Sequence, residues 1–375
     1  ALLEGLQGNK KSVMSATLEN TRKYLSESAT AGATSAGNVA TLNRVILPVI
    51  RRVMPTVIAN ELVGVQPMTG PVGQIHTLRV RYSDTVENTT AGQEALSPFN
   101  IARAYSGNET EATPAGNSTS ALEGAAGNRM SIQILKQTVE AKTRKLSARW
   151  TFEAAQDAQS MHGIDVEAEI MAALAQEITA EIDQEVLGSL TTLSGAAAQT
   201  YDQAAVSGTA TFVGDEHAAL AVQINRVSNL IAQRTRRGAG NWAVVSPFAL
   251  TILQSATTSA FARTTEGTFE APTNTKMVGT LNNAMKVYVN TYASDSANVL
   301  VGYKGSSESD AAAFYCPYIP LMSSGVVLDP TSFEPVVSFM TRYGYVELNN
   351  TASSLGNAAD YLANVAITNS NVSFS

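Results

Sequence analysis

A chain of 375 residues is long for one compact domain and predicts two lobes. No run of apolar residues approaches the ~20 that a membrane-spanning helix requires. A net charge of −7 argues against a dedicated nucleic-acid binder, which would carry a large basic patch. The single cysteine, Cys316, excludes an intramolecular disulfide and is typical of a buried small side chain in a reducing compartment.

The first 42 residues are rich in Ser, Ala, Thr, Asn and Gly and contain few large apolar side chains. Such a segment cannot bury enough surface to offset the entropy of ordering it, which predicts an arm or a tail. From Leu42 onward apolar residues cluster, and Pro48 and Pro55 suit the start and the end of a helix. Because the chain begins at Ala1 rather than Met, we expect that it was trimmed or released by proteolysis.

Two strands separated by a long polar stretch predict a projecting hairpin. From Gly73 to Tyr82 apolar side chains alternate with polar ones, and a matching alternation runs from Arg129 to about Lys145. The intervening residues, 83–128, are dominated by Thr, Ala, Gly, Asn, Ser and Glu, which predicts a flexible or lightly folded tip. Isolated two-stranded ribbons are marginal in water, so a neighbouring subunit is expected to support this one.

A long helix is predicted after Gly163, over about Ile164 to Leu190. Its apolar residues recur at every fourth position, so they form a stripe that winds around the helix by about 40° at each step. The stripe consists of Val166, Ile170, Leu174, Ile178, Ile182, Val186 and Leu190. The same segment carries seven acidic residues and no Lys or Arg, whereas Arg129–Arg149 carries six basic residues and one acid.

These opposite charges predict that the basic strand and the acidic helix meet, within one chain or between neighbouring subunits. We take the contact between subunits as the hypothesis. It joins basic residues of one subunit to acids of its neighbour's helix: Lys136, Lys142, Arg144 and Lys145 on one side, and Glu169, Glu177, Glu181 and Glu185 on the other.

From about Phe212 the pattern changes to short helices and strands, which predicts a second lobe. Helices are expected over Ala218–Arg237 and Pro247–Ser255, the latter opened by its proline. The expected strands are short and mostly apolar: Trp242–Val245, Lys286–Val289, Val299–Val301, Ala313–Tyr315, Val336–Leu348 and Tyr361–Thr368.

Patterns that would indicate chemistry are missing from the sequence. The three histidines, His76, His162 and His217, lie in different regions, and no cluster of Cys or His suits zinc. The acids of the long helix lack the Glu-x-x-His pattern of di-metal bundles. Gly302–Ser307 lacks the first glycine of a phosphate-binding loop, and no nucleophile elbow occurs. We therefore expect no enzyme activity, no metal and no cofactor.

Several unusual strings do carry a resemblance, in the order in which they occur along residues 42–350. They are Gly64–Met68, Gly70–Gln74, Glu140–Arg144, His162–Glu169, Thr235–Asn241, Val301–Gly305, Tyr315–Leu321 and Phe339–Gly344. Through them the chain resembles the major capsid protein family of T-even-type tailed phages. One departure is that residues 83–128 are short and of low complexity, whereas some relatives carry a folded insertion domain there.

The resemblance implies an α+β fold of the Hong Kong 97-like capsid type. Its expected parts are an N-terminal arm (1–42), a peripheral domain (43–72, 149–211 with the long spine helix, and 331–375), an extended loop hairpin (73–148, with tip 83–128) and an axial domain (212–330). In that fold the extended loop of one subunit lies across the peripheral domain of the next.

The function implied is self-assembly into the icosahedral-type shell that encloses the double-stranded DNA of a tailed phage, in a proteolytically trimmed form. The implied partners are other copies in hexamers and pentamers, together with a vertex protein, portal, scaffold, prohead protease and decoration proteins. No membrane and no sequence-specific nucleic-acid partner is expected. The implied location is the virion capsid, assembled in the host cytoplasm. Alternatives are a pentameric vertex paralogue, an encapsulin-type shell or, from another class, a soluble two-lobed enzyme.

Overall fold

The structure is a computed structural model that describes residues 59–86, 89–95, 104–107, 115–203, 205, 213–256, 261–263, 276–282, 284–294, 296–348 and 358–368. All of them belong to a compact unit that begins at Ile50. The predicted arm over residues 1–42 and the predicted helix between Pro48 and Pro55 lie outside the described residues.

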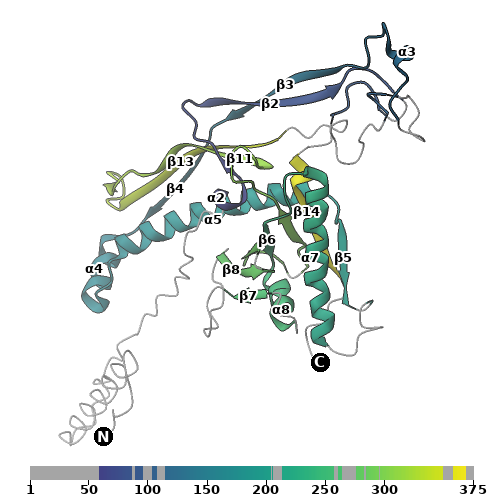
Figure 1. Ribbon diagram of the computed structural model, residues 1–375. Coiled ribbons are helices and arrows are strands. Elements are labelled where there is room, and N and C mark those ends of the chain that lie inside the picture. Colours follow the sequence, from purple (N-terminus) through teal and green to yellow (C-terminus); the bar gives the residue numbers. More distant parts are fainter. Residues whose placement is uncertain are drawn as a thin grey trace, which may run out of the picture. The chain divides into compact units, whose positions relative to one another are not determined.

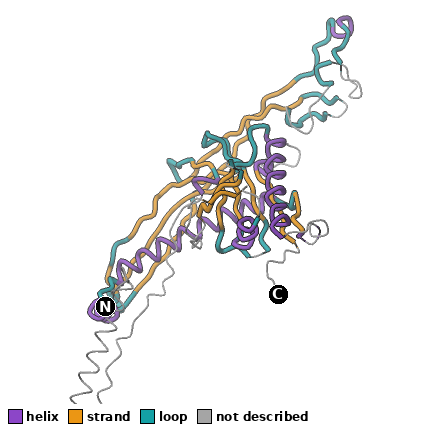
Figure 2. The backbone as a smooth tube through the Cα atoms, turned by 60° about the horizontal axis from the view of Figure 1, so that its bottom comes forward, coloured by secondary structure: helices purple, strands orange, loops and turns teal. Residues whose placement is uncertain are grey.

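The hairpin is formed by β2 (Val72–Tyr82) and β3 (Met130–Glu140), which pair in antiparallel register along their full lengths. Figures 1 and 2 show these two strands as one extended ribbon. The expected return strand is wrong in one respect, because β3 ends at Glu140. The basic strand β4 (Lys142–Arg149) leaves the hairpin and pairs with β13 (Pro335–Glu347) instead.

A five-stranded sheet contains β4 and β13 together with β1 (Gly64–Val65), β11 (Ala313–Ser323) and β12 (Val327–Leu328). Next to β1 is the short helix α2 (Ala59–Leu62). The hairpin joins this sheet at its base, where Val139 of β3 packs with Phe314 and Cys316 of β11.

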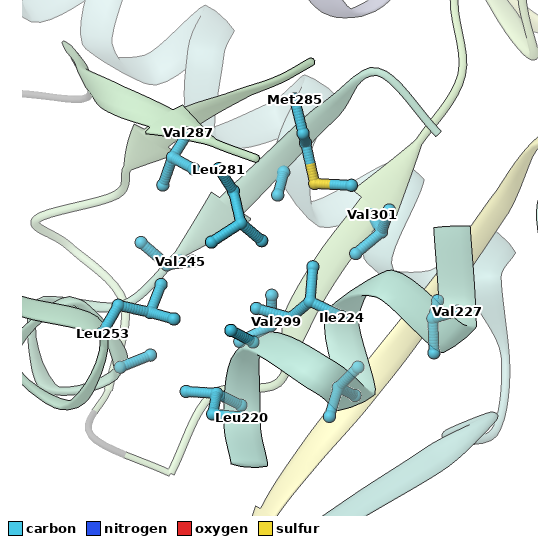
Figure 3. Packing of buried hydrophobic residues seen from close by; sticks show 14 of the residues in the cluster. Leu220, Ile224, Val227, Val245, Leu253, Leu281, Met285, Val287, Val299 and Val301 are labelled. Carbon is cyan, nitrogen blue, oxygen red and sulfur yellow. The ribbon is translucent and has the colours of Figure 1, made fainter. Parts of the chain in front are cut away.

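A seven-stranded sheet forms the second lobe, in the order β5-β14-β10-β6-β9-β8-β7. Its strands are β5 (Gln199–Asp202), β6 (Trp242–Val245), β7 (Phe261–Arg263), β8 (Lys276–Leu281), β9 (Met285–Val289), β10 (Val299–Gly302) and β14 (Leu362–Thr368). Helices α7 (Val213–Thr235) and α8 (Pro247–Ser255) pack on this sheet, and η1 (Ala358–Tyr361) precedes β14. Figure 3 shows the core between α7 and the strands, with Leu220 and Ile224 facing Val299.

Two strands that were expected in the peripheral domain pair in the seven-stranded sheet, so two expected domain boundaries change. Strand β14 was assigned with residues 331–375 to the peripheral domain, yet it pairs with β10 and β5 in the seven-stranded sheet. Strand β5, expected within the peripheral part 149–211, lies in the same sheet. We therefore draw the second lobe to include residues 199–202 and 362–368. The mixture of helices and sheets confirms the α+β class.

The long helix α5 (Val166–Ser194) contacts both lobes. It begins where Asp165 accepts hydrogen bonds from the backbone N–H groups of Glu167 and Ala168, as an N-cap aspartate does. Leu174, Ile178 and Ile182 pack against β13 and β4, and further along the helix Val186, Leu187 and Leu190 pack against the seven-stranded sheet. The preceding helix α4 (Phe152–His162) ends at Gly163, whose left-handed φ of 66° suits glycine.

The described part of the hairpin end is lightly folded, which is one of the two forms expected for it. The rings of Tyr82 and Tyr105 pack with their centroids 4.5 Å apart and their planes tilted by 51°, and Ala95 completes this small cluster. The guanidinium of Arg79 lies 3.1 Å from the carboxylate of Glu94 and is almost fully buried. A buried ion pair and a pair of aromatic rings give this low-complexity segment the contacts that its composition did not indicate. The short helix α3 (Thr119–Leu122) lies in the same segment.

The burial of Leu190 makes it a test of the contact between α5 and the second lobe. Leu190→Ala should lower the free energy of unfolding of the unassembled subunit by about 2–5 kcal/mol, because the lost side chain leaves a cavity. Val222→Ala on the exposed face of α7 should change it by less than about 0.5 kcal/mol. Urea unfolding followed by fluorescence measures both, and equal effects would contradict the packing described here.

Candidate assembly surfaces

Arg144 of β4 is the centre of a charged cluster that ties the five-stranded sheet to α5. Its guanidinium donates to Glu181 at 2.5 Å and to Glu185 at 2.6 Å. It also donates from Nε to the hydroxyl oxygen of Tyr343 at 2.6 Å, and that hydroxyl in turn donates to Glu185. A planar guanidinium that meets two carboxylates and a phenol fixes the helix to both β4 and β13.

The electrostatics of this cluster favour the charged forms. Burial alone would lower the pKa of Arg144, but its hydrogen bonds to Glu185 and Tyr343 outweigh burial and raise it. For Glu185 burial alone would raise the pKa, and the hydrogen bonds from Arg144 and Tyr343 together with the nearby Lys142 charge lower it. Burial and the neighbouring Glu185 raise the pKa of Tyr343. The ion pair is therefore kept over the whole neutral range of pH.

The four basic residues that were expected to meet a neighbouring subunit do not share one surface. Lys142 and Arg144 share the face of β4 that carries Leu146 and Ala148 against α5. Lys145 lies on the opposite face and is exposed, and Lys136 is exposed on the hairpin. Within the described residues neither Lys145 nor Lys136 has an ion pair with a carboxylate.

The expected contact between subunits is thus corrected for Arg144, which meets Glu181 and Glu185 of its own chain. The physical reason is that β4 belongs to the sheet on which α5 packs, so the short distance within the chain brings the charges together. The contacts expected of Lys136, Lys142, Lys145, Glu169 and Glu177 with a neighbour stay predictions. Glu177 is exposed on α5, and Glu169 is partly buried near its beginning.

An exposed apolar surface on the hairpin was missed by the sequence analysis. Leu78 lies opposite Ile134 in the β2–β3 ladder, and Val80 lies opposite Ile132. The side chains of Leu78, Ile132 and Ile134 are 65%, 68% and 66% exposed. We call these three residues the hairpin apolar face. The alternation of Ile132 and Ile134 with polar residues was visible in the sequence, but nothing local showed that the chain leaves this face uncovered.

A metal site is not indicated among the described residues. They contain no group of three or more His, Cys, Asp or Glu side chains that could hold a metal ion. Cys316 is buried and unpaired, and burial raises the pKa of its thiol. No helix in the described ranges is long and apolar enough to span a membrane.

A partly buried Ser–His contact, which the sequence could not indicate, lies between α7 and α8. Ser255 Oγ and His217 Nδ1 are 2.6 Å apart, and burial lowers the pKa of His217. The same hydroxyl also contacts the backbone carbonyl oxygens of Thr251 and Ile252 of its own helix. His217 is buried and Ser255 is exposed, and their contact joins the two helices.

A two-lobed α+β chain that projects an extended hairpin with an uncovered apolar face is a protein built to be completed by other copies. Its described surface carries an exposed apolar face that suits a contact with another protein. The fold and these surfaces define the class of assembling structural proteins.

Comparisons with known proteins agree with this class. A family model described as major capsid protein Gp23 matches residues 39–372. The major capsid protein of Enterobacteria phage T4 is 30% identical, with 89% of this chain and 80% of that protein covered. The major capsid protein of Vibrio phage KVP40 is 29% identical over 88% of this chain and 82% of that protein.

The chain therefore belongs to the Gp23 family of major capsid proteins. Among solved structures, the capsid of Myoviridae phage XM1 aligns with a TM-score of 0.48 at 10% identity, covering 84% of this chain and 92% of that one. The family assignment rests on the sequence comparisons alone.

Arg144→Gln should destabilise the subunit, because it leaves Glu181 and Glu185 without their guanidinium. We expect a loss of about 1–2 kcal/mol in the free energy of unfolding, since the cluster is partly screened by solvent. Arg149→Gln is the matched control, because Arg149 is mostly exposed and lies 3.8 Å from Glu334. Urea unfolding of both variants compares them, and an equal loss for the two would argue against the cluster.

The lowered pKa of Glu185 predicts a dependence on pH. Because its pKa in the folded chain is below the ordinary value of 4.5, the stabilisation is fully present above pH 4.5. It is lost as pH falls through the lowered folded value. The stability difference between the native chain and Glu185→Gln should therefore shrink below pH 4.5. Thermal unfolding across this range measures it, and a difference that stays constant with pH would contradict the assignment.

Proposed function

We propose that this chain is the shell subunit of a tailed phage head, which assembles through many copies in hexamers and pentamers around double-stranded DNA. The observation that carries the proposal is the hairpin apolar face. Three large apolar side chains that are about two-thirds exposed carry an unfavourable free energy of hydration on a free monomer. A subunit that buries them against other copies in an assembly removes this cost.

Membership of the major capsid protein family supports the same conclusion. The base of the hairpin is well anchored on β11, so the ribbon is presented at a defined position rather than folded back on its own chain. Many repeated weak contacts give a shell collective stability, and no single interface needs to be strong. We propose a structural role without catalysis, and location in the virion capsid.

The partners beyond further copies of the chain stay predictions from the sequence resemblance. They are a vertex protein, portal, scaffold, prohead protease and decoration proteins. Assembly in the host cytoplasm is likewise part of the proposal. We propose the names extended loop, peripheral domain and axial domain for the parts described above, and the arm over residues 1–42 stays a prediction from the sequence.

Electron microscopy of the purified protein by negative stain tests the proposal. We expect shells, tubes or sheets of hexamers and pentamers that form above a threshold concentration, because apolar burial between copies drives association. A species that stays monomeric at every concentration and salt condition would contradict it. Copy number per particle separates a main shell subunit from a vertex protein, which would occupy only the five-fold positions.

A further inference from the structure

Helix α7 has one side in the core of the second lobe and the other side in solvent. Leu220, Ile224 and Val227 point into the core (Figure 3). The exposed residues recur at helical spacing on the opposite side. The second half of this exposed side is formed by Arg226, Asn229, Gln233 and, directly after the helix, Arg236. We call these four residues the α7 donor face, because each side chain offers N–H groups to a partner.

The charge of this segment is opposite to that of the chain. Residues 218–237 contain four arginines and no Asp or Glu, whereas the whole chain has a net charge of −7. Cations at the end of a helix are favoured by its dipole, which accounts for Arg234, Arg236 and Arg237. The dipole does not account for Arg226, which lies more than two turns before the last helical residue.

The backbone at Arg236 adds a second observation. Its φ of 52° is in the left-handed region, where the residue that follows a helix is usually glycine or asparagine. An arginine in this conformation stores backbone strain, and such strain is typical of positions where the side chain has a function.

The acids around the α7 donor face leave it positively charged. Arg237 is paired with Asp310 at 2.6 Å, and Glu216 is buried and accepts a hydrogen bond from Gln203. Asp215, at the start of α7, lies about 16 Å from Arg226 along the helix. Within the described residues Arg226 has no ion pair with a carboxylate.

The chemistry of the face matches phosphate. Guanidinium forks pair with phosphate oxygens, and the amides of Asn and Gln donate to the same oxygens. Arg226 to Arg236 spans about 15 Å, over which one DNA strand presents about four phosphates. Contacts between proteins are centred on apolar and aromatic side chains instead. Among the described residues of α7, Val222 is the only large apolar side chain that is exposed.

We propose that the α7 donor face is turned toward the interior of the shell and contacts the phosphates of the enclosed DNA. This inference rests on the proposed function, because it needs a shell that contains DNA. The contact is independent of base sequence, since it is made to the backbone. It is weak for each subunit because the net negative charge of the chain repels DNA, and many copies act together.

Binding of a short fluorescent DNA duplex to the unassembled subunit, followed by anisotropy at a series of salt concentrations, tests the contact. Arg226→Gln should weaken binding several-fold and reduce the slope of log affinity against log salt by about 1, because one phosphate contact is lost. Asn229→Lys should increase the slope by about 1, because it adds a contact. Lys145→Gln is the matched control, since it removes an exposed cation from β4.

The results have distinct meanings. Equal losses in Arg226→Gln and Lys145→Gln would show attraction to overall charge alone and would overturn the proposal. A slope that Arg226→Gln leaves unchanged would overturn it as well. If that variant binds DNA normally but gives fewer particles, the face contacts another copy rather than DNA, and the proposal is again wrong.

An introduced thiol tests where the face lies in the shell. The only native thiol, Cys316, is buried, so Gln233→Cys reports without background. A small maleimide should label Gln233→Cys in the unassembled subunit and in shells. A maleimide carried on a large polyethylene glycol should label only the unassembled subunit, because the shell wall excludes it.

The labelling also separates this inference from the proposed function. Shells that react with the large reagent would place the face outside, and shells that resist the small reagent would place it against another copy. Both results overturn the inference and leave the shell function standing. Failure of the native chain to form any assembly under the microscope would instead count against the proposed function.

Discussion

The packing of α5 against two sheets at once is the constraint on which the rest of the structure depends. Its apolar residues recur every fourth position and so wind around the helix. Leu174 to Ile182 reach the five-stranded sheet, and Val186 to Leu190 reach the seven-stranded sheet. One helix therefore contributes to a core beside each of the two sheets. Figure 2 shows this long helix running beside the strands that it covers.

Polar side chains lie on α5 where it passes from one core to the other. Asp183 is buried there. The pKa of Tyr315 is raised first by the burial of its own side chain and then by the nearby charge of Asp183. Gln184 exchanges hydrogen bonds with Asn290 of the second lobe, while Glu185 meets Arg144. Groups with such directional contacts fix the rotation of the helix, because a small turn would break several of them together.

The hairpin obeys a different constraint. Its ladder satisfies the backbone groups that the two strands direct at each other, but a two-stranded ribbon has only one neighbour for each strand and no second layer. Its base is covered by β11 and its end by the Tyr82 cluster, which leaves the middle apolar and uncovered. Such a surface suits a protein whose final environment includes its own copies, because burial is then completed by assembly rather than by folding.

The sequence by itself determined the elements whose signals are local. The fourfold stripe after Gly163 placed α5, Pro247 placed the start of α8, and alternation placed β2. It also placed acids and bases on elements that do meet. Only the tertiary structure decided that β4 leaves the hairpin, that β14 joins the second lobe and that Arg144 finds its acids within one chain. The reason is that strand alternation specifies which side chains share a face, whereas the pairing partner of β4 lies almost two hundred residues away and is selected by packing of the whole chain.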